Sequence, residues 1–182
     1  MAIDYCSTDP LGSFDTIRCP KDDLVGGMPA GLFLEDGHGI TNPSDAAQIN
    51  AALLAGTAHR VLRCSFTIDA PTPDETESDV PCESANITNY TRKGAYVNPN
   101  VTPNNIEQHD KLFDGRTFAG AILAQCGKEG VIEKVSWINS PLKLKGGLII
   151  PKGNKEMQRF EGELDWSSMK NPSMWNVPVG IF

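Results

Sequence analysis

The stretch MQRFEGELDW, residues 157–166, constrains the fold more than any other part of the chain. Its apolar and small residues alternate with charged ones, and this period of two predicts a strand with one face on a core and the other in water. The residues expected to point inward are Phe160, Leu164 and Trp166. The opposite face is mostly acidic, and its candidate surface residues are Glu161, Glu163 and Asp165.

The segments before this strand favour further short strands joined by turns. We expect strands over residues 117–125, 131–138 and 142–150, the last with a bulge or bend at its two adjacent glycines, Gly146 and Gly147. Turn residues separate them, as in Gly127–Gly130 and Pro151–Asn154. Successive short strands with such turns indicate an antiparallel meander.

Two helices and one earlier strand are expected upstream. Residues 42–56 have a capping Asn42, a proline at the first helical position and a terminal Gly56. Residues 102–115 begin with Thr102-Pro103 and place His109 on a packing face. Between the helices, residues 59–68 predict a strand whose alternation slips near Leu62–Arg63, which indicates a bulge.

Three segments look irregular. Residues 1–40 are rich in glycine and proline and predict an extended N-terminal arm, in which residues 30–34 could form one short strand. Residues 69–104 are acidic and proline-rich at their start and predict a long loop, with a weak hairpin over residues 87–97. Residues 167–182 predict a tail with apolar residues at its end.

Together these elements predict a β-rich α+β fold. We expect one domain over residues 41–182, formed by an antiparallel sandwich or partial barrel with one or two flanking helices. The long acidic loop and the extended arm would project from it. A chain of 182 residues is long enough for one such core.

Charge and cysteine content exclude some classes of function. The formal net charge of −7 argues against a protein that grips nucleic acid through its phosphates. The five cysteines are odd in number and include no CxxC pair, so we expect free thiols. No apolar run is long enough for a membrane span, and residues 1–12 do not resemble a signal peptide.

The sequence shows no catalytic or metal-binding constellation. There is no G-x-S-x-G elbow, and the three histidines lie in unrelated settings. The acidic run at residues 74–79 lacks the spacing of a calcium loop. Glu161 and Glu163 could serve as paired carboxylates of a small hydrolase, but a solvated strand face is the simpler interpretation. We therefore expect no enzyme activity, no cofactor and no metal.

The order of the last strands carries a resemblance to a known class of proteins. The segments GVIEKVSWI, LKLKGGLIIP and MQRFEGELDWSS, followed by a short apolar tail, resemble tailed-bacteriophage virion structural proteins, most of all tail-tube or tube-like ring subunits. The helix over residues 42–55 and the loop over residues 69–104 are similar to the flanking helix and ring-to-ring loop of such subunits. Portal-proximal rings, capsid auxiliary proteins and tail terminators are related possibilities.

This resemblance implies a non-enzymatic subunit that self-assembles into a ring or tube, contacts other virion proteins and lets DNA pass without binding it specifically. It would be assembled in the host cytoplasm, would act in the virion and would need no membrane. Glu161, Glu163 and Asp165 would line the lumen or an outer wet face, and Trp175, Ile181 and Phe182 would form a subunit interface. The alternative is a secreted or surface binding module with a β-sandwich fold, in which disulfides or glycans would be expected.

Overall fold

The computed structural model describes residues 28–76, 86–126, 132–153 and 157–182. These residues form ten strands and two helices. In chain order the elements are β1 (Met28–Leu34), α1 (Ala46–Ala55), β2 (Ala58–Ile68), β3 (Thr72–Thr76), β4 (Asn86–Asn98), α2 (Pro103–Leu112), β5 (Thr117–Phe118), β6 (Gly120–Cys126), β7 (Ile132–Ile138), β8 (Leu142–Ile149), β9 (Arg159–Ser167) and β10 (Ser173–Asn176). None of the described helices is long and apolar enough to cross a membrane.

All described strand pairs are antiparallel and belong to one sheet, in the order β10-β7-β6-β1-β2-β4-β9-β8-β5, with β3 paired to β4. The sheet curls, because β5 and β6 are separated only by Ala119. Residues 117–126 therefore pair with β8 through β5 and with β1 through β6. The sheet is strongly curved without closing into a barrel. The expectation of a β-rich fold with two helices is confirmed.

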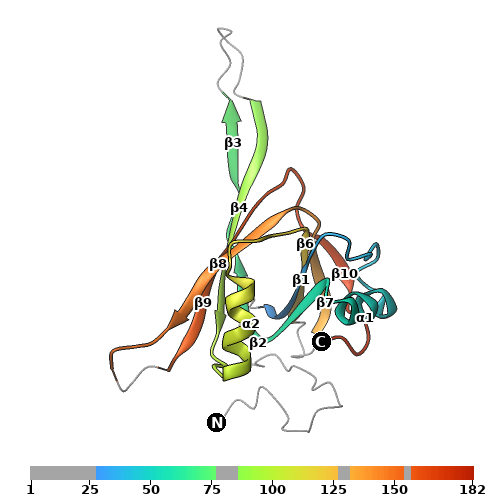
Figure 1. Ribbon diagram of the computed structural model, residues 1–182. Helices are drawn as coiled ribbons and strands as arrows, with labels where there is room; N and C mark the ends of the chain where they lie inside the picture. The colour runs from blue at the N-terminus through green and yellow to red at the C-terminus, as the bar shows by residue number, and fades with distance from the viewer. Residues whose placement is uncertain (1–27, 77–85, 127–131, 154–156) are drawn as a thin grey trace.

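Two hairpins extend away from the curled sheet in different directions (Figure 1). One consists of β3 and the first half of β4, and the other of the ends of β8 and β9. β4 joins the first hairpin to the body, since its second half pairs with β2 on one edge and with β9 on the other. Parts of β3, β4, β8 and β9 therefore lie outside the hydrophobic core of the chain.

The curled sheet separates two hydrophobic cores. The first is covered by α2 and contains most of the aromatic rings, including Phe33, Phe66, Tyr96, Phe118 and Phe160. The second lies on the other face of β1 and β6 and is covered by α1 and the last residues of the sequence. β1 supplies both cores, because alternate side chains of a strand point to opposite faces.

The strand predicted from MQRFEGELDW is confirmed as β9. Phe160, Leu164 and Trp166 are buried, with at most 4% of each residue exposed. Phe160 packs against His109 of α2, with ring centroids 3.8 Å apart. The amphipathic pattern is therefore what holds β9 and α2 together.

Both helices are present, and they differ slightly from prediction at their ends. α1 is capped by Asp45, whose carboxylate accepts from the backbone N–H of Ala47 at 2.9 Å, so the predicted cap at Asn42 is wrong. Gly56 ends α1 in the left-handed region, as expected, with φ of 73°. α2 is capped by Thr102 and begins at Pro103, as expected.

The predicted arm over residues 1–40 is too long. Residues 28–34 form β1, which lies between β2 and β6 and is almost fully buried. Residues 35–40 follow it and include the buried Ile40 of the second core. The rest of the expected arm, residues 1–27, lies outside the described residues.

The predicted loop over residues 69–104 contains regular structure. β3 and β4 pair from Thr72↔Thr91 to Thr76↔Asn86. β4 is one continuous strand, so the hairpin predicted over residues 87–97, with its turn expected at Lys93-Gly94, is wrong. Acidic residues and prolines at an exposed edge disfavour edge-to-edge pairing of β3 with a strand of another sheet. Residues 77–85 of this segment, which include Glu77, Asp79 and Glu83, lie outside the described residues.

The predicted tail contains a strand, and one of the two predicted bulges is present. Residues 173–176 form β10 and pair with β7, so residues 167–182 are not an irregular tail. The bulge near Leu62–Arg63 is confirmed by a shift in register between β1 and β2. The bulge at Gly146 and Gly147 is wrong, because β8 and β9 pair without a shift.

Candidate functional site

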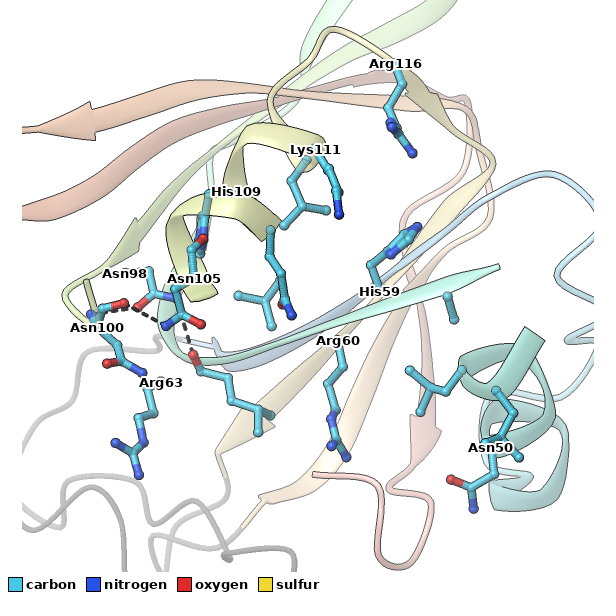
Figure 2. A pocket seen from close by; sticks show the side chains of 17 residues that line it. Asn50, His59, Arg60, Arg63, Asn98, Asn100, Asn105, His109, Lys111 and Arg116 are labelled. Atoms are coloured by element: carbon cyan, nitrogen blue, oxygen red, sulfur yellow. Dashed lines mark hydrogen bonds between the residues drawn. The ribbon is translucent and has the colours of Figure 1, made fainter. Parts of the chain in front are cut away.

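A groove of about 830 Å³ lies over β2, between α1 and α2. Figure 2 shows the side chains that line it, with α2 at one end and α1 at the other. The described lining residues include four cationic side chains and no carboxylate; the cations are Arg60, Arg63, Lys111 and Arg116. We call this surface the basic groove. It is unexpected in a chain with a net charge of −7.

Arg63 stands at one end of the basic groove because of the bulge in β2. Its φ of 59° makes it the one residue other than glycine in the left-handed region among those described. Such a conformation is costly for an L-residue and is kept only where its surroundings impose it. The Arg63 side chain is exposed, and it makes no ion pair within the described part of the chain.

An ionic cluster of three side chains lies at the other end. The Glu35 carboxylate is 2.7 Å from Nε2 of His59 and accepts from Nη1 of Arg116 at 2.6 Å. The hydrogen bond from His59 is the main cause that lowers the pKa of Glu35, and Arg116 acts in the same direction. Arg116 also pairs with Asp114, and these bonds raise its pKa. The cluster links Glu35 just after β1, His59 of β2 and Arg116 just before β5.

A buried polar network supports the wall formed by α2. Nδ1 of His109 is 2.7 Å from the carbonyl of Asn105, which can only accept, so Nδ1 carries the proton. Nε2 of the neutral ring then accepts from the Tyr96 hydroxyl at 2.5 Å. Asn98 donates to the same hydroxyl at 3.1 Å. Both the Tyr96 hydroxyl and the ring are satisfied, and they fix α2 on β4.

Burial lowers the pKa of His109, and this makes stability dependent on pH. The unfolded chain binds this proton more readily, so the His109 contribution is present above the unfolded pKa, about 6.5, and is lost as the pH falls below it. We expect His109→Phe to keep the stack on Phe160, to leave the Tyr96 hydroxyl without its acceptor, and to lower the free energy of unfolding by about 1–3 kcal/mol at pH 7.5.

Chemical denaturation of both proteins at pH 7.5 and at pH 5 checks this prediction. The difference in unfolding free energy between wild type and His109→Phe should narrow at the lower pH. Only the unfolded wild type can then gain a proton at position 109, and this proton lowers the stability of the wild type. His38→Gln is the control, because His38 accepts only from the nearby backbone N–H of Ile40. A difference that stays constant between the two pH values contradicts the prediction.

The acidic face of β9 is present but is neutralised by cations. Lys93 lies 3.1 Å from Glu163, and Lys145 lies 3.0 Å from Asp165. Glu161 pairs with Arg159 on the same strand. The hydrogen bond to Glu163 raises the pKa of Lys93. The sequence showed the carboxylates on one strand and missed the two lysines, which come from the strands on either side.

The three residues predicted to form a subunit interface have different positions. Ile181 and Phe182 are 0% and 8% exposed and belong to the second core of their own chain. Their side chains are therefore not available to a neighbour. Trp175 lies on β10 and is half-buried against Trp137, with ring centroids 6.1 Å apart. It remains a candidate, because β10 is an edge strand.

Of the two described cysteines, one agrees with the expectation of free thiols and one does not. Cys64 is a free thiol, buried in the first core, and burial raises its pKa, so it is unsuited to act as a nucleophile. Cys126 is disulfide-bonded, so the expectation of a free thiol there is wrong. Cys6, Cys19 and Cys82 lie outside the described residues. Among the described side chains, no group of three or more potential ligands could hold a metal ion.

Sequence reasoning did not find the basic groove. Its cations come from β2, from α2 and from Arg116, the residue before β5, and they are separated by many residues in the chain. Of the lysines that lie close together in the sequence, Lys143 and Lys145 are on β8, Lys152 follows β8, and Lys155 lies outside the described residues. The slip in alternation at Leu62–Arg63 was the only local sign of this site.

Comparison with protein-family models, with curated proteins and with solved structures finds no match.

Proposed function

We propose that this chain is a non-enzymatic virion subunit that self-assembles into a ring or a stack of rings, of the phage tail-tube or connector type, and forms a conduit for DNA. The observation that carries the proposal is the pair of hairpins that extend beyond the chain's own core (Figure 1). A monomeric protein gains little from strands held in solvent, whereas a ring uses them to reach its neighbours.

The unpaired strand edges support the same proposal. β5 pairs with β8 only at Leu142 and Lys143, so the rest of that edge of β8 has no partner strand among the described residues. Next to it, Ile149 and Ile150 are 39% and 66% exposed. Exposed apolar residues beside an open edge are typical of a surface that joins another chain. Continuation of the sheet across this edge is the contact we propose within a ring.

The charge balance suits a conduit. A net charge of −7 disfavours the counterion release that holds DNA on a basic protein. Because Glu163 and Asp165 have lysine partners, the face of β9 is close to neutral in sum rather than strongly repulsive. We therefore propose that DNA passes such a ring without being retained, and that low net attraction rather than a dense acidic wall is the reason.

Assembly can be tested on the purified chain. We expect sedimentation velocity to show species at multiples of the 19.7 kDa subunit mass, and negative-stain microscopy to show rings or tubes. The assembled rings or tubes should not retain duplex DNA in low salt. A chain that sediments as a monomer over the whole accessible concentration range contradicts the proposal.

One observation favours the alternative, a secreted or surface binding module. The disulfide at Cys126 is typical of proteins from an oxidising compartment. Thiol labelling of the denatured, unreduced protein distinguishes the two settings. Protein taken directly from its native source would retain the disulfide in the secreted module, and it would label at Cys126 in a virion subunit assembled in a reducing cytoplasm.

A further inference from the structure

We propose that the basic groove is a receiving site for the acidic β3–β4 hairpin of a second copy of this chain. The inference rests on the proposed function, because it names the contact that would join subunits of successive rings. It differs from the strand-edge contact at β8, which would join neighbours within a ring. The two contacts use different surfaces and can be tested separately.

The groove has the chemistry of a site for carboxylates. Arg63 and Lys111 are exposed at its rim, Lys111 in an exposed pair with Glu107 at 3.0 Å. Asn50 and Gln108 add carboxamides that can donate hydrogen bonds. Guanidinium groups are suited to carboxylates because they donate two parallel hydrogen bonds. Arg63 in particular is presented by a strained bulge and has no ion-pair partner in the described part of the chain.

The first hairpin carries the complementary charge. The segment from Ala70 to Ala85 contains Asp74, Glu75, Glu77, Asp79 and Glu83 and has no lysine or arginine. Of these residues, Asp74 and Glu75 lie in β3. The second hairpin does not fit the groove, because the sequence between β8 and β9 contains Lys152 and Lys155. Charge complementarity therefore selects one hairpin of the two.

The hairpin that enters the groove has to come from another copy. β3 and the first half of β4 point away from the body of the molecule, whereas α1 and α2 lie on the body (Figure 1). The groove is lined by residues of α1, β2 and α2. The hairpin of one chain cannot reach its own groove unless β4 leaves its pairing with β2 and β9. A volume of about 830 Å³ can accommodate several side chains of a strand.

Charge reversal in the groove tests this proposal. We expect Arg63→Glu to weaken self-association at least about tenfold in sedimentation velocity, because a like charge then faces the acidic hairpin. Lys111→Glu should act in the same direction. The matched control is Lys170→Glu, which makes the same change in net charge at an exposed residue outside the groove. Thermal unfolding of each variant confirms that it is folded.

A charge swap provides the decisive comparison. Glu75→Lys alone should weaken self-association, and the double variant Arg63→Glu/Glu75→Lys should restore it toward the wild-type value, since each new charge meets its complement in the next copy. Equal self-association of wild type and Arg63→Glu would overturn the groove contact and leave ring assembly through β8 standing. The groove contact would also be overturned if the two single variants each weakened self-association and the double variant showed only the sum of the two losses.

A monomeric wild type overturns the proposed function, and a peptide then decides the groove. The probe is a synthetic peptide with the sequence of residues 72–80, TPDETESDV, and its control has every acid replaced by the matching amide. We expect the acidic peptide alone to bind the wild type, and Arg63→Glu to abolish the binding. Failure of the acidic peptide to bind overturns the inference about the groove.

Discussion

Replacing Phe182 by alanine is expected to lower the free energy of unfolding by about 3 kcal/mol, and Ile181→Ala should have an effect of similar size. Both side chains are buried in the second core, with 8% and 0% of the residue exposed. The loss should not depend on protein concentration, because the contacts lie within one chain. Chemical denaturation at two concentrations measures it.

Val179→Ala is the matched control. Val179 is 89% exposed, two residues before Ile181, and its truncation should change stability by less than about 0.5 kcal/mol. If these last residues served instead as the subunit interface that the sequence suggested, the opposite pattern would appear. Ile181→Ala and Phe182→Ala would then leave the stability of the monomer unchanged and would abolish assembly.

The position of Ile181 and Phe182 shows a limit of sequence interpretation. An apolar pair at the end of a polar segment can cover the chain's own core or a neighbour's, and the pattern is the same in both cases. What distinguishes them is the second core, formed by β1, β6 and α1, which needs a cover on the face that α1 leaves open. Arg60 also holds this segment, donating to the carbonyl of Ile181 at 3.1 Å.

β9 and β1 differ in how visible they are in the sequence. β9 has one wet face, so its alternation is obvious. β1, MPAGLFL, has both faces buried and reads as a short apolar run with a proline and a glycine. Such a run lacks the period that identifies a strand, and its position among many glycines made residues 1–40 look irregular. The central strand was therefore the hardest one to predict.

The β3–β4 hairpin was hidden for a different reason. Pro73 and the acidic residues beside it argue against a central strand, and that inference is correct, since β3 lies at an edge. The prediction of a long loop was wrong because it applied this inference to the whole of residues 69–104, which include β4. β4 contains Tyr96, whose ring is fully buried, and its alternation over residues 92–98 continues well past the turn expected at Gly94.

The candidate site depended on contacts that no local pattern shows. The acidic residues of β9 were visible, but Lys93 and Lys145, which neutralise two of them, come from flanking strands. The basic groove likewise joins β2 to α2 through residues about fifty positions apart. In both places the sheet order decides the net charge of a surface, and that order follows from how the strands pack rather than from the composition of any one segment.

A close approach between two backbones in the sheet gives a second large effect. We expect Gly94→Ala to lower the free energy of unfolding by about 3 kcal/mol. A Cβ at this position would lie 2.4 Å from the carbonyl oxygen of Thr67 on β2. β4 cannot move away, because Gly94 pairs with Ile68 on one edge and with Leu164 on the other. The clash therefore reaches both neighbouring strands.

Two glycines of β8 make this prediction specific. Gly147→Ala is the control, since its Cβ would meet nothing within 4 Å. It should be neutral or slightly stabilising, because alanine lowers the conformational entropy of the unfolded chain. Gly146→Ala should fall between the two. Its Cβ would lie 2.2 Å from the carbonyl oxygen of Glu161, but β8 has one open edge there and can shift. Thermal and chemical unfolding should rank the losses in the order Gly94, Gly146, Gly147. A Gly94→Ala protein as stable as Gly147→Ala would mean that β4 is not held between β2 and β9 as described.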